Sequence, residues 1–464
     1  MTKSPVFYSL IWSVVKNWGG RFTSLIVFAL LTRLLDAHDI GAVAFVAAII
    51  TILSAVAEMG LAEYLIYKED TPAARNQIFW FQIYVTLAMY ILLALAGPPL
   101  LHSMARHDAA NMLPYLGLVL PLVALSSVQD AIQRAALQFR AIAIRSLIGM
   151  VAGGVVGVTL AASGAGMWSL VFKHLTEMVV MAAIMWRTSN WRPDWGCDWR
   201  GFRKVFNYTR YMAGSRLLDV FTANVDELIV GLAMGQQQLG FYSIGKKLYT
   251  ISIELLGGTA GYIAGPLLAR ANGNATVLWN MFVQAIRYGS YLIVPLYAAL
   301  YFFAPVVIPL LFGQQWAGAV WILQSFCFVG MLFPFHQFTW PMLMVAGDAA
   351  DSFRYALIRN LGGLAILAVA AFLSWEAFVL AQAVRSVFTI GTGWLYLRRV
   401  IAFRYAELGM ALLPGLLAAG AVGATFVLLA WTIGQRFIVQ ASGVTLVLGL
   451  TYLLMLAQLR RVRS

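Results

Sequence analysis

Charged residues are scarce in this chain. They account for 11% of its 464 residues, whereas hydrophobic residues account for 61%. Soluble domains carry about 25% charged residues, so this composition excludes a soluble globular protein. Runs of about 20 apolar residues are what an α-helix needs to cross a bilayer, and the runs here lack the two-residue alternation of β-barrel strands. We therefore expect an all-α polytopic membrane protein.

Cysteine is nearly absent as well, with only Cys197 and Cys327 in the whole chain. Two cysteines in separate predicted segments exclude a disulfide scaffold or a cysteine-based metal cluster. A cleavable leader is not expected, because the first apolar run is too long and lacks a small-residue cleavage site. The loops are short, the longest polar connection being 187–206, so no soluble catalytic domain is inserted and most membrane enzymes are disfavoured.

Apolar runs long enough to span a bilayer are the main organising feature of the sequence. We predict about 14 transmembrane helices, at 7–35, 40–66, 77–98, 112–133, 146–163, 165–186, 206–233, 238–268, 279–303, 316–346, 354–373, 376–397, 407–433 and 437–458. The expected domains are a six-helix lobe at 1–190, a cytoplasmic loop at 191–205, a second six-helix lobe at 206–400, and two further helices with a basic tail at 401–464.

The distribution of arginine and lysine supports this map. With both termini in the cytoplasm, most of the 32 Lys and Arg residues fall on the cytoplasmic side, as the positive-inside rule predicts. One such patch is Arg134, Arg140 and Arg145. The net charge of +13 thus reflects membrane topology and suits an anionic lipid leaflet. It gives no reason to expect a nucleic-acid partner.

A weak internal repeat links the two predicted lobes. A short polar turn, an apolar residue and a glycine precede a new helix at Ile40-Gly41 and again at Leu239-Gly240. Upstream, Gly20-Arg21 parallels Ser215-Arg216. Internal repeats of this kind are typical of transporters.

Eight cations lie inside predicted spans, although each costs about 2.5–3.5 kcal/mol at the bilayer centre on insertion scales. On the first helix, Lys16 and Arg21 contribute to one polar side. Lys173 is expected to form an i, i+4 ion pair with Glu177. All of these cations except Lys173 are predicted to line a substrate-binding cavity. They are Lys16, Arg21, Arg216, Lys246, Lys247, Arg287 and Arg385.

Acidic residues in the spans are candidates for ion coupling. The seventh predicted helix places Arg216, Asp219, Asp226 and Glu227 on one arc, where Arg216 can pair with Asp219. An acid without a partner could carry a proton, and a structural ion pair is the alternative for each. The candidates are Glu58, Asp219, Asp226, Glu227 and Glu254. The surplus of cations favours an anionic passenger, such as a phosphate or pyrophosphate group.

Five stretches of the chain resemble the polysaccharide transporter family, the Wzx-type oligosaccharide flippases. They are LLTRLLDAHDIGAVAF with AEMGLAEYLIYKED, ANVDELIVGLAMGQQQLGFYSIGKKL, SGAGMWSLV, WRPDW and LFGQQWAGAVWILQ. The resemblance runs from about residue 8 to 400, and Asp226 matches the family's Asn-x-Asp position. The chain departs from the pattern at His38-Asp39, where a proline-aromatic step is common.

The resemblance implies a MATE-like fold, with two six-helix lobes around a central cavity and two C-terminal helices. It implies a bacterial inner-membrane protein that moves undecaprenyl-pyrophosphate-linked oligosaccharide to the periplasmic leaflet by alternating access. Membrane lipids, a polysaccharide polymerase and export machinery are the partners that it implies. It implies no cofactor, and coupling to H⁺ or Na⁺ is suggested for the family.

Three other classes compete with this interpretation. A MATE-like exporter of organic cations should have an acidic, aromatic cavity, which the cationic surplus disfavours. A membrane polymerase or acyltransferase should have a long extracytoplasmic loop or a compact catalytic motif, and the stretch HSMARHD at 102–108 fits no acid–base arrangement. A scaffold protein would leave the eight cations in the spans without an explanation.

Overall fold

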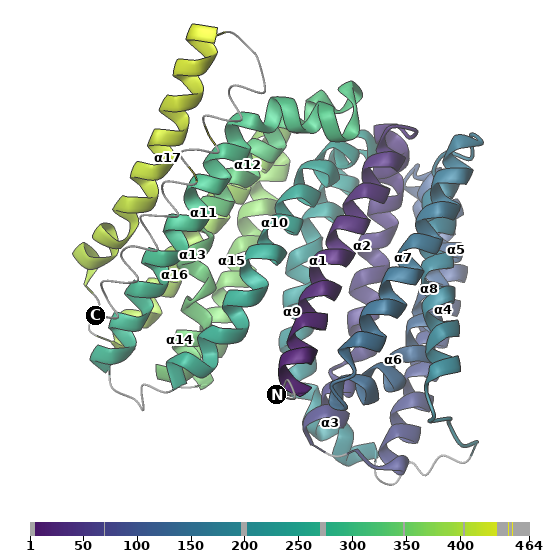
Figure 1. The fold of residues 1–464 in the computed structure, drawn as a ribbon. Helices are drawn as coiled ribbons and strands as arrows, with labels where there is room; N and C mark the ends of the chain where they lie inside the picture. Colours follow the sequence, from purple (N-terminus) through teal and green to yellow (C-terminus); the bar gives the residue numbers. More distant parts are fainter. Residues whose placement is uncertain are drawn as a thin grey trace. The chain divides into compact units, whose positions relative to one another are not determined.

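The computed structural model describes residues 5–68, 70–195, 202–269, 275–346, 349–401 and 404–433, together with Val444 and Leu448. All the regular secondary structure in these residues is helical (Figure 1). Two compact units, Met1–Ser243 and Ile244–Ser464, make up the chain. The expected division into lobes at 1–190 and 206–400 follows topology, not contacts, and it stays a prediction.

The first unit contains nine helices among its described residues and the start of a tenth. They are α1 (Pro5–Thr32), α2 (Ala37–Glu58), α3 (Leu61–Tyr67), α4 (Pro72–Ser103), α5 (His107–Gly117), α6 (Val119–Ala135), α7 (Phe139–Ala162), α8 (Trp168–Thr188) and α9 (Phe202–Ala233), followed by α10 (Gln236–Ala269). The second unit continues with α11 (Ala275–Phe312), the 3₁₀ helix η2 (Gln314–Ala319), α12 (Val320–Met331), α13 (Phe333–Gln337), α14 (Thr339–Ala346), α15 (Ala349–Leu373), α16 (Trp375–Val400) and α17 (Tyr405–Ile433).

Helices cover the expected spans from 7–35 to 407–433, and of the expected span 437–458 the structure describes only Val444 and Leu448. Among the described residues, ten helical stretches are long and apolar enough to cross a membrane, so the chain is a multi-pass membrane protein. The expected count of fourteen stays a prediction. Helix α9 is not among the ten, and it carries Arg216, Asp219, Asp226 and Glu227 within its last eighteen residues.

Three of the expected spans contain a break in the structure. The span 40–66 divides into α2 and α3, and the span 112–133 divides into α5 and α6 at Leu118. The span 316–346 becomes η2, α12, α13 and α14. The sequence predicts a kink there because Pro334 and Pro341 cannot donate a helical hydrogen bond, and the structure confirms it. The side chain of His336, between these prolines, lies outside the described residues.

Glycines bring helices of the first unit close together. Gly149, Gly153 and Gly157 repeat every four residues on α7 and face α8, where a Cβ at Gly153 would lie 2.6 Å from the carbonyl oxygen of Lys173. Small residues at this spacing let two helix backbones approach within a membrane. Helix α1 runs beside α7 (Figure 1), with Gly154 packed against Val27.

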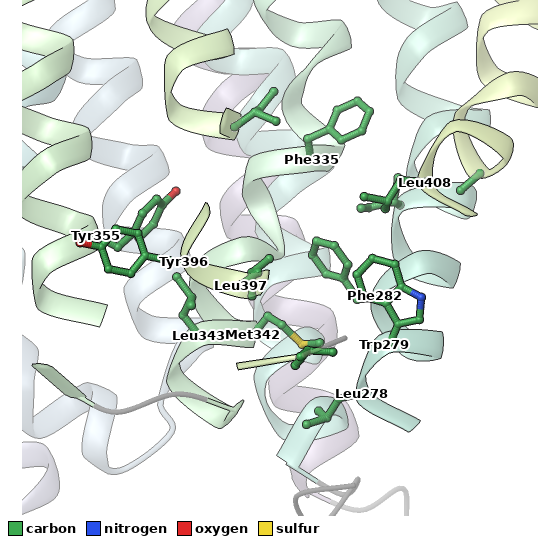
Figure 2. Close-up of a cluster of buried hydrophobic side chains, with 14 residues drawn as sticks. Leu278, Trp279, Phe282, Phe335, Met342, Leu343, Tyr355, Tyr396, Leu397 and Leu408 are labelled. Carbon is green, nitrogen blue, oxygen red and sulfur yellow. The ribbon is translucent and has the colours of Figure 1, made fainter. Parts of the chain in front are cut away.

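The second unit has an aromatic and aliphatic core at one end of its helices. Leu278, Trp279 and Phe282 of α11 pack with side chains from α13 to α17, as Figure 2 shows. Trp279 also donates its indole N–H to Glu407 of α17 over 2.5 Å. The indole thus fills apolar space while its polar atom is satisfied, which fixes α17 against α11.

The two glycines of the predicted repeat touch each other's helices. A Cβ on Gly41 would lie 1.7 Å from the carbonyl oxygen of Gln236, and a Cβ on Gly240 would lie 2.0 Å from that of Ala37. Gly41 therefore meets the residue four positions before Gly240, and Gly240 meets the residue four positions before Gly41. The starts of α2 and α10 cross backbone to backbone, in a contact that admits no side chain at either glycine.

Candidate functional site

A sharp corner after α2 places two carboxylates at one point of the first unit. Met59 and Gly60 have left-handed backbones, with φ of 44° and 69°. This conformation suits glycine and is uncommon for methionine. It ends α2 at Glu58 and starts α3 at Leu61, which puts Glu63 in the first turn of α3.

Arg216 of α9 binds both of these carboxylates. Its Nη2 lies 2.9 Å from Glu58 Oε2, and its Nη1 donates to Glu63 Oε1. The three side chains are partly open to their surroundings, with 44% of Arg216 and 36% of Glu58 exposed. These two partners lie on α2 and α3, and the expected pair of Arg216 with Asp219 within the helix stays a prediction. One guanidinium between two carboxylates carries a formal charge of −1, so the group is anionic as it stands.

A second ion cluster lies beside the first, and it includes one buried arginine, Arg145. Asp130 accepts hydrogen bonds from Arg145 and Arg134, each over 2.5 Å. Arg145 is only 9% exposed and also donates to Gln133 over 3.0 Å. Asp130 and Arg134 are within electrostatic range of Glu58. The basic patch expected at Arg134, Arg140 and Arg145 thus includes two arginines that share one carboxylate.

A small cavity opens on the other side of Glu58. It lies between α2, α4 and α6 and offers about 10 Å³ to the centre of a water molecule. Its polar lining comes from Ser54, Glu58, Gln82, Thr86 and Ser127. Glu58 therefore belongs both to the cavity and to the ion cluster of Arg216.

The other predicted acids of α9 have varied surroundings. Asp226 is buried and accepts a hydrogen bond from the hydroxyl of Tyr242 over 2.6 Å. Tyr242 is itself fully buried, which makes it a structural partner of Asp226. Glu227 is half-buried and Asp219 is exposed, and both make further interactions. Ion coupling by these three acids stays a prediction.

The predicted pair on α8 is present in the structure. Lys173 Nζ lies 3.1 Å from Glu177 Oε2, in the expected i, i+4 arrangement. Gly153 and Gly157 of α7 pack against this turn of α8. The pair is therefore part of the α7–α8 contact.

The predicted cations of the second unit lie on three helices. Lys246 and Lys247 are half-buried on α10, together with Glu254, and all three make further interactions. Arg287 is half-buried on α11, and its buried Nε has no hydrogen-bond partner among the described residues. Arg385 of α16 is half-buried and packs close to Gly363.

Arg21 of the first unit is half-buried on α1. The side chain of Lys16 lies outside the described residues. The prediction that these two residues and Arg216 share one cavity with the cations of the second unit stays a prediction.

Sequence reasoning missed Glu63, Asp130 and the hydroxyls of the cavity. Glu63 follows Glu58 by five residues, which would put the two on different faces of one helix. Only the left-handed corner brings them together, and Gly60 is the signal in the sequence that could have indicated it. Apart from Glu58, the polar residues of the cavity are neutral, so the charge pattern of the sequence does not indicate them.

The fold defines the class of this protein. Among solved structures the chain is similar to the lipid II flippase MurJ in an inward closed conformation, with a TM-score of 0.77 at 12% identity over 97% of this chain and 99% of that one. It is also similar to an inward-facing multidrug resistance MATE family transporter, with a TM-score of 0.64 at 16% identity over 82% and 95% of the two chains. The fold is therefore of the MATE and MurJ type.

The sequence comparisons show the family. A family described as polysaccharide biosynthesis protein matches residues 30–321, and the chain belongs to it. The succinoglycan biosynthesis transport protein ExoT of Rhizobium meliloti (strain 1021) is 24% identical over 392 residues, which cover 83% of this chain and 79% of that protein. The chain is thus a flippase-type membrane transport protein of polysaccharide biosynthesis and not an enzyme.

Proposed function

We propose that this protein moves lipid-linked oligosaccharide repeat units from the cytoplasmic to the periplasmic leaflet of a bacterial inner membrane. The carrier lipid would be undecaprenyl pyrophosphate, and the product would serve an exopolysaccharide, a capsule or an O-antigen. Membership of the polysaccharide biosynthesis family and the MATE and MurJ type of fold support this proposal. So does the short length of the connections between helices, which leaves no room for an inserted catalytic domain.

The observation that carries the proposal is the state of Arg216. A guanidinium on a membrane helix needs a partner, and Arg216 has two carboxylates while remaining 44% exposed. Arginine also binds phosphate groups with two parallel hydrogen bonds. A diphosphate could therefore replace the carboxylates of Glu58 and Glu63 at the same donor atoms.

The rest of the proposed site follows from the sequence. Together with Arg216, the diphosphate would meet some of Lys16, Arg21, Lys246, Lys247, Arg287 and Arg385. The sugars would take the place of water in the central cavity that the family resemblance implies, and the prenyl chain would stay in the lipid, since only the charged and polar parts are costly to bury. Both termini would lie in the cytoplasm.

The experiment that tests this function uses a strain lacking the gene. Lipid-linked oligosaccharides are extracted, and a membrane-impermeant sugar-oxidising reagent shows which leaflet holds them. Complete repeat units trapped on the cytoplasmic face, with no polymer outside the cell, are expected. Units that accumulate on the periplasmic face would overturn the proposal, since they would place the defect at polymerisation. Normal polymer with new sensitivity to cationic dyes would overturn it in favour of a drug exporter.

A further inference from the structure

The segment 189–195 follows α8 and contains the WRPDW stretch, which the proposed site does not use. Arg192 folds this segment back at the end of α8. Its guanidinium donates to the carbonyl oxygens of Trp186 and Trp191, the latter over 2.9 Å, and it lies 5.5 Å from the centre of the Trp186 ring. An arginine that binds the last carbonyls of a helix satisfies groups that have no partner within the helix. The segment therefore begins in a fixed turn.

Two side chains one turn apart on α4 hold the end of this segment. Asn76 Oδ1 accepts the backbone N–H of Asp194 over 3.0 Å, and Trp80 donates its indole N–H to the backbone oxygen of Asp194 over 2.8 Å. Trp191 packs edge-on against Phe79, with 5.7 Å between the ring centroids. Both backbone groups of Asp194 thus bind α4, and the segment 189–195 forms a strap across the first turns of that helix.

The strap ends in an exposed aromatic side chain. Trp195 is 91% exposed, and its ring lies 5.5 Å from that of Trp80. Trp80 stacks in turn on Tyr84, with 5.8 Å between the centroids and 27° between the ring planes. Tyr84 is 56% exposed. Trp195, Trp80 and Tyr84 therefore form an aromatic ladder that runs from the strap onto α4.

The aromatic ladder continues into an apolar row on the same face of α4. Leu87, Ile91 and Leu95 are exposed there. At 100° per residue, this row shares an arc of about 80° with Trp80 and Tyr84. Helix α4 is long and apolar enough to cross a membrane, so an exposed apolar row on it suits contact with lipid chains. The aromatic ladder begins where this row ends, near the start of the helix.

Tryptophan and tyrosine concentrate at the boundary between lipid and water, where an apolar ring and a polar atom are both accommodated. We propose that the aromatic ladder is a membrane-interface anchor that binds the glycerol and headgroup region of the bilayer. It holds the connection between the two predicted lobes at the membrane surface. A sugar ring could also stack on these side chains, but the continuity with the apolar row of α4 favours lipid. The inference goes beyond the proposed function and does not depend on the cargo.

The test measures the depth of position 195 in the full-length protein in lipid nanodiscs. Trp195→Cys, in a background without Cys197 and Cys327, is labelled with the environment-sensitive dye NBD. Leu87→Cys and Ile91→Cys, labelled in the same way, calibrate the depth, since the eleven residues from 80 to 91 rise about 16 Å, or half of a bilayer core. The label at position 195 is expected to be quenched most by a nitroxide on the lipid headgroup. The labels at 87 and 91 are expected to be quenched increasingly by nitroxides on the acyl chains.

Asn190→Cys is the matched control, because Asn190 is exposed in the same strap but lies outside the aromatic ladder. Its label is expected to be quenched by iodide in the water and only weakly by the lipid nitroxides. Trp80→Ala, with the label at position 195, should raise the released population of the strap by about two- to tenfold, because it removes a hydrogen bond and a ring contact. Trp80→Phe keeps a ring and should have a smaller effect.

The inference is overturned if iodide quenches the label at position 195 as strongly as the label at position 190, since the strap then lies in water. It is also overturned if neither iodide nor the lipid nitroxides reach that label, since protein or sugar then covers the aromatic ladder. Size-exclusion chromatography checks that each variant is folded.

A second measurement serves if Trp195→Cys does not fold. The fluorescence that Trp195→Phe loses relative to the wild type should be quenched by lipids brominated near the glycerol, and an absence of quenching would overturn the inference equally. Because no lipid-linked sugar is present and no transport is measured, all of these outcomes leave the proposed function to be judged by the leaflet assay.

Discussion

The two ends of α2 are held in different ways. At its start, Gly41 lies against the backbone of α10, and a Cβ on Gly41 would be 1.7 Å from an oxygen of Gln236. At its end, Glu58 holds Arg216 of α9 through an ion pair that stays partly exposed. The first contact depends on shape alone and admits no ligand. The second depends on charge, and a ligand of the same charge can take over one partner.

This difference would suit the alternating access that the proposed function requires. A contact between bare backbones closes tightly and opens without breaking ion pairs. An ion pair between partly exposed groups leaves its donor atoms within reach of a ligand, so a substrate of the same charge as the carboxylates can replace it. Both contacts join α2 to helices that follow the longest predicted loop, with Gly41 against α10 and Glu58 against α9. A movement of α2 would therefore change both contacts.

The largest effect is expected where an ion pair is structural. Asp130→Ala leaves the guanidinium of Arg145 buried, with Gln133 and Met185 as its remaining hydrogen-bond partners among the described residues. Breaking a buried pair typically costs about 3–5 kcal/mol, so the amount of folded protein should fall sharply. Thermal unfolding of the purified variant, followed by fluorescence, measures this. An unfolding midpoint like that of the wild type would mean that the Asp130 cluster is as replaceable as the Glu58 cluster.

The next largest effect is expected at Arg216, whose ion pairs with Glu58 and Glu63 a ligand could replace. Arg216→Ala should lower export by at least about tenfold, because hydrogen bonds to charged groups contribute about 1.5–3 kcal/mol. The unfolding midpoint should stay close to that of the wild type. Arg216→Lys should recover only part of the activity, since an ammonium lacks the planar fork of guanidinium. Polymer yield and membrane content of the protein are measured together. Full export by Arg216→Ala would remove Arg216 from the site.

A smaller effect is expected at the start of α2. Gly41→Ala inserts a methyl group into the contact with Gln236, and overpacking typically costs about 1–3 kcal/mol. The conformation described here should become less populated and export should fall. Gly214→Ala on α9 is the control, because no atom lies within 4 Å of its added Cβ. Cysteine accessibility at Asp36→Cys in each background reports the opening. Equal accessibility in both would show that the glycine contact does not limit opening.

The sequence predicts much of this fold and less of its site. The helices follow from apolar runs, and Lys173 with Glu177 follows from helical spacing. The repeat around Gly41 and Gly240 is visible in the sequence, but their mutual contact is not, because it joins residues about two hundred positions apart. The pairing of Arg216 with both Glu58 and Glu63 depends on the left-handed corner at Met59 and Gly60, and in the sequence only Gly60 hints at that corner.

The central claim is that Arg216 exchanges its carboxylates for a diphosphate. The direct measurement is the affinity of the purified protein for a polyprenyl pyrophosphate lipid, obtained by native mass spectrometry. Arg216→Ala should bind at least about tenfold more weakly. Glu63→Gln, which removes a competing carboxylate, should bind a few-fold more tightly than the wild type. Weaker binding by Glu63→Gln, or unchanged binding by Arg216→Ala, would contradict the exchange.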